Sequence, residues 1–342
     1  MRHAAIACLV TLLAAALWGA PAAADEAQYE EAYSRAEPLP ADGKVYLTNI
    51  SGDVRIKTWT RNEVKIDAMK RSTAASAGSA RKNADRITID VRREDGRLKI
   101  ETKYPEGRIV LRKFNVSVDY TLTVPAEASV TVNIVSGDII AANMAGRAKL
   151  TSVSGSIRAE KLTGGGEFTS VSGNIDLKDI RGSAEASDVS GSITLSDVSG
   201  AVEVETVSGS VTADYLYDAE SVDIAVHSGD IVYEGGVNPD GSYSFATHSG
   251  SITVTLPPDA AFDFECESFS GHIESDFRVA SETTGKARQR EMTYNALRGT
   301  ANGGGADVTI ETFSGSIELR KSGEGEREGS HTRSQHPDGD DD

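Results

Sequence analysis

Two histidines occupy equivalent places in a repeated motif. His227 and His248 each stand two residues before the glycine of a Ser-Gly pair, so we expect their imidazoles to stack on successive layers. Stacked imidazoles could share a metal ion, but a zinc site needs further ligands, and the spacing supplies none. We therefore treat His227 and His248 as weak metal candidates, expect them to continue an aromatic column, and predict no cofactor.

Carboxylates raise the question of calcium. Short glycine repeats also occur in calcium-binding β-rolls, which carry carboxylates in each turn. Here the residue after each Ser-Gly pair is mostly a hydroxyl residue. Asp179 and Asp197 fall in one predicted column, with Asp188 on the opposite side of the repeat. A cation could relieve repulsion between stacked acids, but water screens exposed acids as well, so we interpret them as solvated surface residues.

Catalysis is a second alternative, because parallel β-helices host polysaccharide lyases and hydrolases. Such enzymes need a walled cleft with clustered acids or a poised base. The coils between residues 137 and 229 are short, and the sequence contains no Ser-His-Asp order, nucleophile elbow or phosphate loop. The serine of each Ser-Gly pair is too regular to be a nucleophile, and we expect it to hydrogen-bond in a turn or a hydroxyl ladder. We predict no catalytic residue.

The repeat itself defines the elements that carry these residues. Its glycines are Gly137, Gly155, Gly173, Gly191, Gly209, Gly229, Gly250, Gly271 and Gly315. From Gly137 to Gly209 the spacing is 18 residues, and it then stretches to 20 and 21. Further glycines halve the period to nine between Gly137 and Gly209. Periodicity of this kind indicates a solenoid.

Apolar residues follow the same period. They stand two residues before and two and four residues after each glycine, which is the alternation of a β-strand. We expect all three positions to point inward, including Val135, Val153 and their equivalents. Each unit is then a strand plus a corner, and two units make one coil. The sequence predicts an all-β, right-handed parallel β-helix with coils of 18–21 residues. It leaves open whether the glycines lie at a bend or inside.

Composition agrees with a thin solenoid. The 342-residue chain has only 6% aromatic residues but 33 glycines, which suits a core one small side chain deep. Its net charge of -17 argues against nucleic-acid binding and against docking on anionic lipid. Cys266 alternates with two phenylalanines, so we expect a buried small hydrophobic residue; a reactive thiol is the alternative.

The chain divides into regions of different character. Residues 1–24 combine a basic start, a short apolar run and a small-residue cleavage site, which is typical of a secretory signal. No later stretch is apolar enough to span a membrane. We predict a signal peptide at 1–24, a polar lead-in at 25–40, a capping β region at 41–133, a solenoid at 134–320 with an insertion at 278–305, and a disordered acidic tail at 321–342.

Three segments resemble a known family. Residues 120–125 (YTLTVP) lead to the Ser-Gly pair at 136–137, residues 256–260 (LPPDA) lead to that at 270–271, and residues 312–317 (TFSGSI) close the repeat. The sequence resembles the bacterial putative-adhesin, or adhesin-like, β-strand-repeat family of unknown function. That resemblance implies a β-solenoid in an exported or envelope protein, without an established activity. Some relatives look tied to envelope-stress signalling, so the resemblance also implies a regulatory role as an alternative.

These observations converge on a binding protein. We expect a non-enzymatic, exported protein, periplasmic or on the cell surface, that offers a scaffold to an envelope protein or glycan. The Ser-Gly edge and the insertion at 278–305 are the faces expected to matter. A polysaccharide-active enzyme and an envelope-stress sensor or scaffold are the alternatives. The oligomeric state and the partner's identity stay open.

Overall fold

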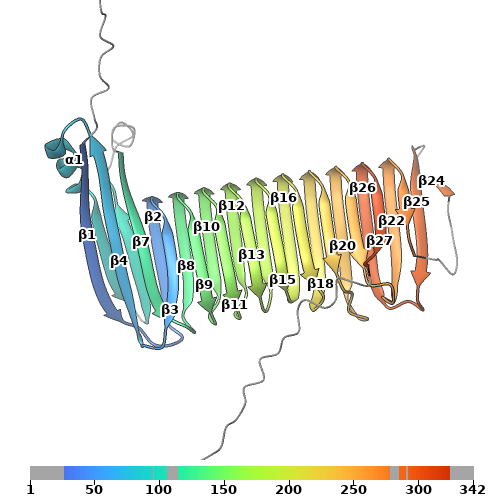
Figure 1. Cartoon of the computed structure of the whole chain (residues 1–342), viewed down its shortest axis with the longest axis horizontal. Helices are drawn as coiled ribbons and strands as arrows, with labels where there is room; N and C mark the ends of the chain where they lie inside the picture. The colour runs from blue at the N-terminus through green and yellow to red at the C-terminus, as the bar shows by residue number, and fades with distance from the viewer. Residues whose placement is uncertain (1–26, 95, 106–114, 278–284, 290–291, 324–342) are drawn as a thin grey trace, which may run out of the picture.

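The computed structural model describes residues 27–94, 96–105, 115–277, 285–289 and 292–323. The predicted signal peptide and most of the predicted tail lie outside these residues. The described chain winds into an elongated stack of coils (Figure 1), and each coil contributes one strand to each of two facing sheets. The β-solenoid predicted from the repeat is therefore confirmed.

We call the two sheets sheet A and sheet B. In spatial order, the strands of sheet A among the described residues are β1 (Ala27–Pro38), β4 (Glu63–Ala74), β7 (Asn115–Pro125), β3 (Val54–Trp59), β9 (Ile139–Met144), β11 (Ile157–Leu162), β13 (Ile175–Ile180), β15 (Ile193–Val198), β17 (Val211–Leu216), β19 (Ile231–Gly235), β21 (Ile252–Leu256), β27 (Ile317–Lys321) and β23 (Ile273–Ser275). From β7 to β23 neighbouring strands run parallel.

Sheet B is ordered in the same way. Its strands are β5 (Thr88–Glu94), β6 (Arg97–Lys103), β2 (Lys44–Ser51), β8 (Ser129–Ser136), β10 (Ala148–Ser154), β12 (Gly166–Ser172), β14 (Ala184–Ser190), β16 (Gly200–Ser208), β18 (Ala219–Ser228), β20 (Ser242–Ser249), β26 (Ala306–Ser314), β22 (Phe262–Ser270), β25 (Met292–Ala301) and β24 (Gly285–Gln289). From β6 to β22 the pairing is parallel, and antiparallel strands close both ends.

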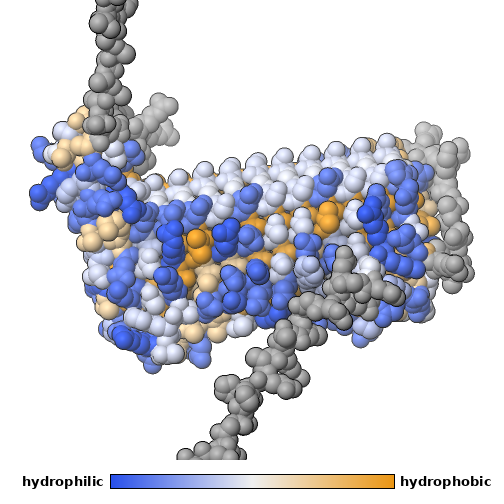
Figure 2. Space-filling view, in the orientation of Figure 1, coloured by the Kyte–Doolittle hydropathy of each residue, from blue (hydrophilic) through white to orange (hydrophobic). Residues whose placement is uncertain are grey.

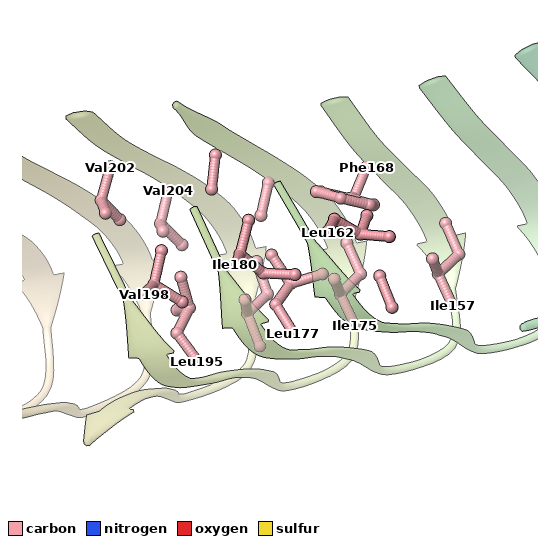
Figure 3. Packing of buried hydrophobic residues seen from close by; sticks show 14 of the residues in the cluster. Ile157, Leu162, Phe168, Ile175, Leu177, Ile180, Leu195, Val198, Val202 and Val204 are labelled. Atoms are coloured by element: carbon pink, nitrogen blue, oxygen red, sulfur yellow. The ribbon is translucent and has the colours of Figure 1, made fainter. Parts of the chain in front are cut away.

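The core fills the space between the sheets. Equivalent residues stack from coil to coil, as where Ile157 lies opposite Ile175 and Ile175 opposite Ile193. Leu162, Phe168 and Ile180 point into the same inter-sheet space (Figure 3) and are fully buried. A coil cannot bury its inner side chains alone, so stacking supplies the hydrophobic stabilisation.

Spatial order departs from chain order at both ends of the stack. The coil formed by β2 and β3 lies between strands that follow it in sequence, and β26 and β27 lie inside β22 and β23. Each inserted coil therefore has parallel neighbours on both sides instead of an open edge. Open strand edges invite aggregation, so this arrangement protects the first and last coils of the repeat.

Within the segment at 25–40, predicted as a polar lead-in, residues 27–38 form strand β1. It pairs antiparallel with β4 along twelve residues, from Ala27 opposite Ala74 to Pro38 opposite Glu63. Its side chains alternate between half-buried and exposed, so an edge strand with few apolar residues gave little signal. Next to it lies the eight-residue helix α1 (Ala77–Ala84), capped by the Ser76 hydroxyl, which accepts from the Ser79 N–H.

The predicted insertion also contains strands. Within residues 278–305, β24 and β25 pair antiparallel with each other, and β25 pairs antiparallel with β22. The described part of the insertion therefore covers the edge of sheet B, much as β5 covers the other end. Among the described residues, no helix is long and apolar enough to cross a membrane.

Candidate functional site

The Ser-Gly pairs form one long corner of the solenoid. In Gly137, Gly155, Gly173, Gly209, Gly229, Gly250 and Gly315 the backbone φ angle lies between +137° and +158°. A Cβ atom on Gly155 would lie 1.9 Å from the carbonyl oxygen of Gly137 in the preceding coil. The glycines therefore lie at a bend, which settles the question left open by the sequence, and the bend has no room for a side chain.

Side chains that follow the glycines form a polar ladder along this corner. The Asp138 carboxylate accepts from the Ser156 N–H at 2.8 Å, and the Asn174 amide oxygen accepts from the Ser192 N–H at 3.1 Å. Each oxygen thus satisfies a backbone donor of the next coil. This explains the preference for Asp, Asn and Ser here without a bound cation.

The serines of the Ser-Gly pairs act mainly through their backbone. In most coils the serine carbonyl accepts from the glycine N–H of the neighbouring coil, as from Gly155 to Ser172 at 3.1 Å. The side chains of Ser154 and Ser172 are exposed. Figure 2 shows this corner as a regular pale row along one long edge, above a largely hydrophilic face.

A second column, polar in most coils, lies buried just inside the corner, three residues before the glycine; Ile134 and Val226 are its apolar members. Ser152 donates to the Gly137 carbonyl at 3.2 Å, and Ser170 donates to the Gly155 carbonyl at 3.3 Å. Thr247, Thr312 and Ser268 donate to glycine carbonyls in the same way. These hydroxyls satisfy carbonyls that would otherwise be orphaned at the bend.

Asp188 occupies this column but lacks a hydroxyl. It is 4% exposed, and neither carboxyl oxygen makes a hydrogen bond of normal geometry. Burial raises the pKa of Asp188 to about 6, and the nearby Ser170 hydroxyl and Val189 N–H offset this only in part. The prediction that Asp188 is a solvated surface acid is wrong, because its strand position points inward.

Outside the same corner runs an apolar stripe on sheet B. We call it the outer stripe; its members in spatial order are Val135, Val153, Val171, Val189, Val207, His227, His248, Phe313 and Phe269. Its valines and phenylalanines are 38–50% exposed. We expected these residues to point inward, and that expectation is wrong. Strand β10 keeps its alternation up to Ser154, so Ser152 points inward and Val153 outward.

The opposite corner differs because a residue there reverses the alternation. Asn143, Lys161, Asp179, Asp197 and Tyr215 adopt left-handed backbone with φ between 53° and 62°. The next residue in each coil then points inward, as the fully buried Leu162 does. In this half of the coil, the apolar residue two positions before the glycine therefore points inward, as predicted.

The aromatic end of the outer stripe is a continuous stack. The ring centroids of His227 and His248 are 5.1 Å apart, those of His248 and Phe313 are 4.8 Å apart, and those of Phe313 and Phe269 are 4.7 Å apart. The spacing in sequence thus placed the two histidines correctly on successive coils. Among the described residues, no group of three or more His, Cys, Asp or Glu side chains is arranged to hold a metal.

Alongside the stripe lies a groove of about 820 Å³, which we call the outer groove. It runs from β12 to β26 and β22, and its lining includes Val189, Asp188, His227, Glu205 and Phe313. The sequence contained a sign of the stripe. In several coils a small polar residue three positions before the glycine is followed directly by a valine two positions before it, so that one of the two must point outward.

Asp179 and Asp197, which the sequence places in one column, have an arginine side chain between them. The Arg181 guanidinium lies 3.1 Å from the Asp179 carboxylate and 3.0 Å from that of Asp197. The hydrogen bond with Asp197 raises the pKa of Arg181. Arg181 therefore supplies the charge that a bound cation would otherwise provide.

Cys266 is fully buried in β22, with its thiol free, as predicted for a small hydrophobic residue. Burial raises the pKa of its thiol to about 12. The reactive thiolate is thus strongly disfavoured at neutral pH.

The fold and the groove define a β-solenoid with an outward apolar stripe along one corner. The model of the Toastrack DUF4097 family matches residues 43–320, and the chain belongs to this family. This agrees with the resemblance drawn from the repeat. No curated protein matches the chain significantly.

Several solved structures are similar to the chain at low sequence identity and low TM-score. A putative adhesin from Bacteroides fragilis NCTC 9343 is 14% identical, with a TM-score of 0.39, covering 84% of this chain and 97% of its own. A putative adhesin from Parabacteroides distasonis ATCC 8503 is 10% identical, with a TM-score of 0.35 and the same coverage. A putative lipid binding protein from that organism is 10% identical, with a TM-score of 0.27, covering 85% and 97%.

Proposed function

We propose that the protein is a non-catalytic binding scaffold of the cell envelope, exported to the periplasm or cell surface, and that the outer groove is its docking surface. The outer stripe carries this proposal. Water-exposed apolar residues usually occur singly, whereas here they form one column across nine neighbouring strands, from Val135 in β8 to Phe269 in β22. Such a patch marks an interaction surface.

The construction of the stripe supports this role. Parallel ladders fix the register of every coil, so the spacing between its side chains is set by the backbone. The surface is therefore preorganised, and a partner would bind without first ordering it. A rigid, repetitive surface suits an elongated partner.

Site-specific photocrosslinking tests the proposal. A photoreactive amino acid replaces Val189 on the outer stripe or, as the control, Thr194, which is exposed on sheet A. Exposure of the full chain to an envelope fraction of the source organism should give one defined adduct from position 189 and none from 194. Equal adducts at both positions, or none at 189, would overturn the proposal.

The nature of the adduct also separates the alternatives. A defined protein partner is expected for a scaffold, including one that acts in envelope-stress signalling. A glycan that is bound and shortened on incubation with the protein would instead support the polysaccharide-active enzyme and contradict our proposal.

A further inference from the structure

We propose that the outer groove receives a cationic amphipathic helix of a partner protein, lying lengthwise along the outer stripe. This inference rests on the proposed function and adds the chemistry of the partner. It follows from the charges beside the stripe, the spacing along it and the orientation of its rings.

The charges come first. Along the groove, from β12 to β22, the outward face of sheet B carries carboxylates on every strand except β20: Glu167, Glu185, Glu203, Glu205, Asp223, Asp307, Glu311, Asp263, Glu265 and Glu267. Lys149 pairs with Glu167, and Arg298 pairs with Glu265 and Glu267. Among the described residues, Glu185, Glu203 and Glu205 have no basic partner within ion-pair distance, and the same holds for Asp223 and Glu311.

The charge of the groove comes from these outward carboxylates. Asp188 also borders the groove, but its side chain points inward and both its carboxyl oxygens are buried, so it adds no charge to the outer surface. The groove thus combines an apolar stripe with uncompensated negative charge, and its complement is apolar and positive.

The spacing favours a helix. Rings on the stripe repeat every 4.7–5.1 Å, and an α-helix rises about 5.4 Å per turn. One apolar side chain per turn can therefore meet about one stripe residue per coil. From Val171 to Phe269 there are seven coils, so the groove is about 29 Å long at the usual strand spacing. A helix of about 20 residues would cover it.

The ring orientation argues against a glycan. His227, His248, Phe313 and Phe269 stack within 3–12° of parallel, so each ring face covers its neighbour and only edges point outward. Sugars pack on aromatic faces, and these are occupied. The carboxylates also disfavour an anionic lipid surface and a second copy of the same face, because like charges would meet.

Designed peptides test the inference. Fluorescence anisotropy would compare the purified protein binding an 18-residue amphipathic Leu/Lys helix with its binding of a Leu/Gln helix of the same pattern. We expect the Leu/Lys helix to bind at least about tenfold tighter. Its affinity should fall about tenfold in a Glu185→Gln/Glu203→Gln/Glu205→Gln variant, and similarly in a Val171→Thr/Val189→Thr/Val207→Thr variant.

The control neutralises ion-paired acids on the other sheet. A Glu160→Gln/Asp176→Asn/Glu318→Gln variant changes three exposed or half-exposed sheet A carboxylates and should leave the affinity within about twofold. Circular dichroism confirms that every variant keeps its β structure. Equal losses in the sheet A and sheet B variants would show unspecific charge attraction and overturn the inference.

Two remaining outcomes separate this inference from the proposed function. If the Leu/Gln helix binds as tightly as the Leu/Lys helix and both weaken in the valine variant, the stripe binds partners but the cationic preference is wrong. If the valine variant binds both helices as tightly as the unchanged protein does, the outer stripe is not a docking surface, and the proposed function is wrong together with this inference.

Discussion

The two halves of each coil look alike in sequence but end differently. In both halves an apolar residue stands two positions before a glycine. At the Ser-Gly corner it is Val153 or Val189, 44% exposed in each case, whereas at the opposite corner it is Leu162 or Ile180, fully buried. One residue makes the difference. Lys161 and Asp179 adopt left-handed backbone just before the buried residue and reverse the alternation, whereas the other strand continues unbroken to the Ser-Gly bend.

This comparison shows how one repeat produces both a core and a binding surface. The half with the left-handed residue turns its last apolar side chain inward and closes the core. In most coils the half without it fills the inner place with a hydroxyl that caps a glycine carbonyl, and its apolar residue remains outside. The outer stripe is therefore a regular consequence of the Ser-Gly bend.

Replacing one glycine at each corner should give the largest difference in unfolding free energy between the two corners. We expect Gly155→Ala to cost more than about 4 kcal/mol of unfolding free energy, because its Cβ would lie 1.9 Å from a backbone oxygen. Gly182→Ala is the matched control, since its nearest neighbour is 3.5 Å away and its φ is +87°. It should cost about 1–2 kcal/mol. Chemical denaturation measures both, and equal costs would contradict the crowded bend.

Truncating the apolar residue in each half should have the next largest effect. Ile180→Ala should cost about 2–5 kcal/mol, because it opens a cavity in the core. Val189→Ala should cost less than about 1 kcal/mol, because its side chain already faces water. Thermal or chemical unfolding of both variants would measure the two costs. A Val189→Ala cost as large as that of Ile180→Ala would mean that the stripe is covered within the protein.

Replacing the acid of the buried polar column should give a smaller effect of opposite sign. Asp188→Ser should stabilise the protein by about 1–3 kcal/mol at pH 7, because the serine can donate to a glycine carbonyl as Ser152 and Ser170 do. The pKa of Asp188 is raised from 3.8 to about 6 in the folded state. The folded protein therefore holds the proton more tightly, and wild-type stability falls as pH rises through this window.

The pH dependence makes that prediction specific. The advantage of Asp188→Ser should shrink towards zero near pH 4, where wild-type Asp188 is protonated and can itself donate. Asp223→Ser, on the exposed face of sheet B, is the control and should show little change between the two pH values. A constant advantage for Asp188→Ser at both pH values would show that buried charge is not its cause.

Much of the architecture could be predicted because it depends on short-range features. The glycine period gave the coil length, the alternation gave the strands, and equal spacing placed His227 over His248. The outer stripe was missed because the same offset from glycine has opposite meanings at the two corners. Only the left-handed backbone at one position of the opposite corner separates them. Asn143 and Asp179 belong to residue types that favour positive φ, but Lys161 and Tyr215 occupy the same position, so residue type alone does not mark it.

The sequence by itself determined that this chain coils, how long each coil is and which residues stack, because these follow from local backbone freedom and strand periodicity. The tertiary structure decided the order of the coils at both ends, the pairing of β1, and which apolar column faces water. The physical reason is that coils with the same profile can stack in any order. Burial of the terminal edges, which is a property of the whole stack, selects the order that is formed.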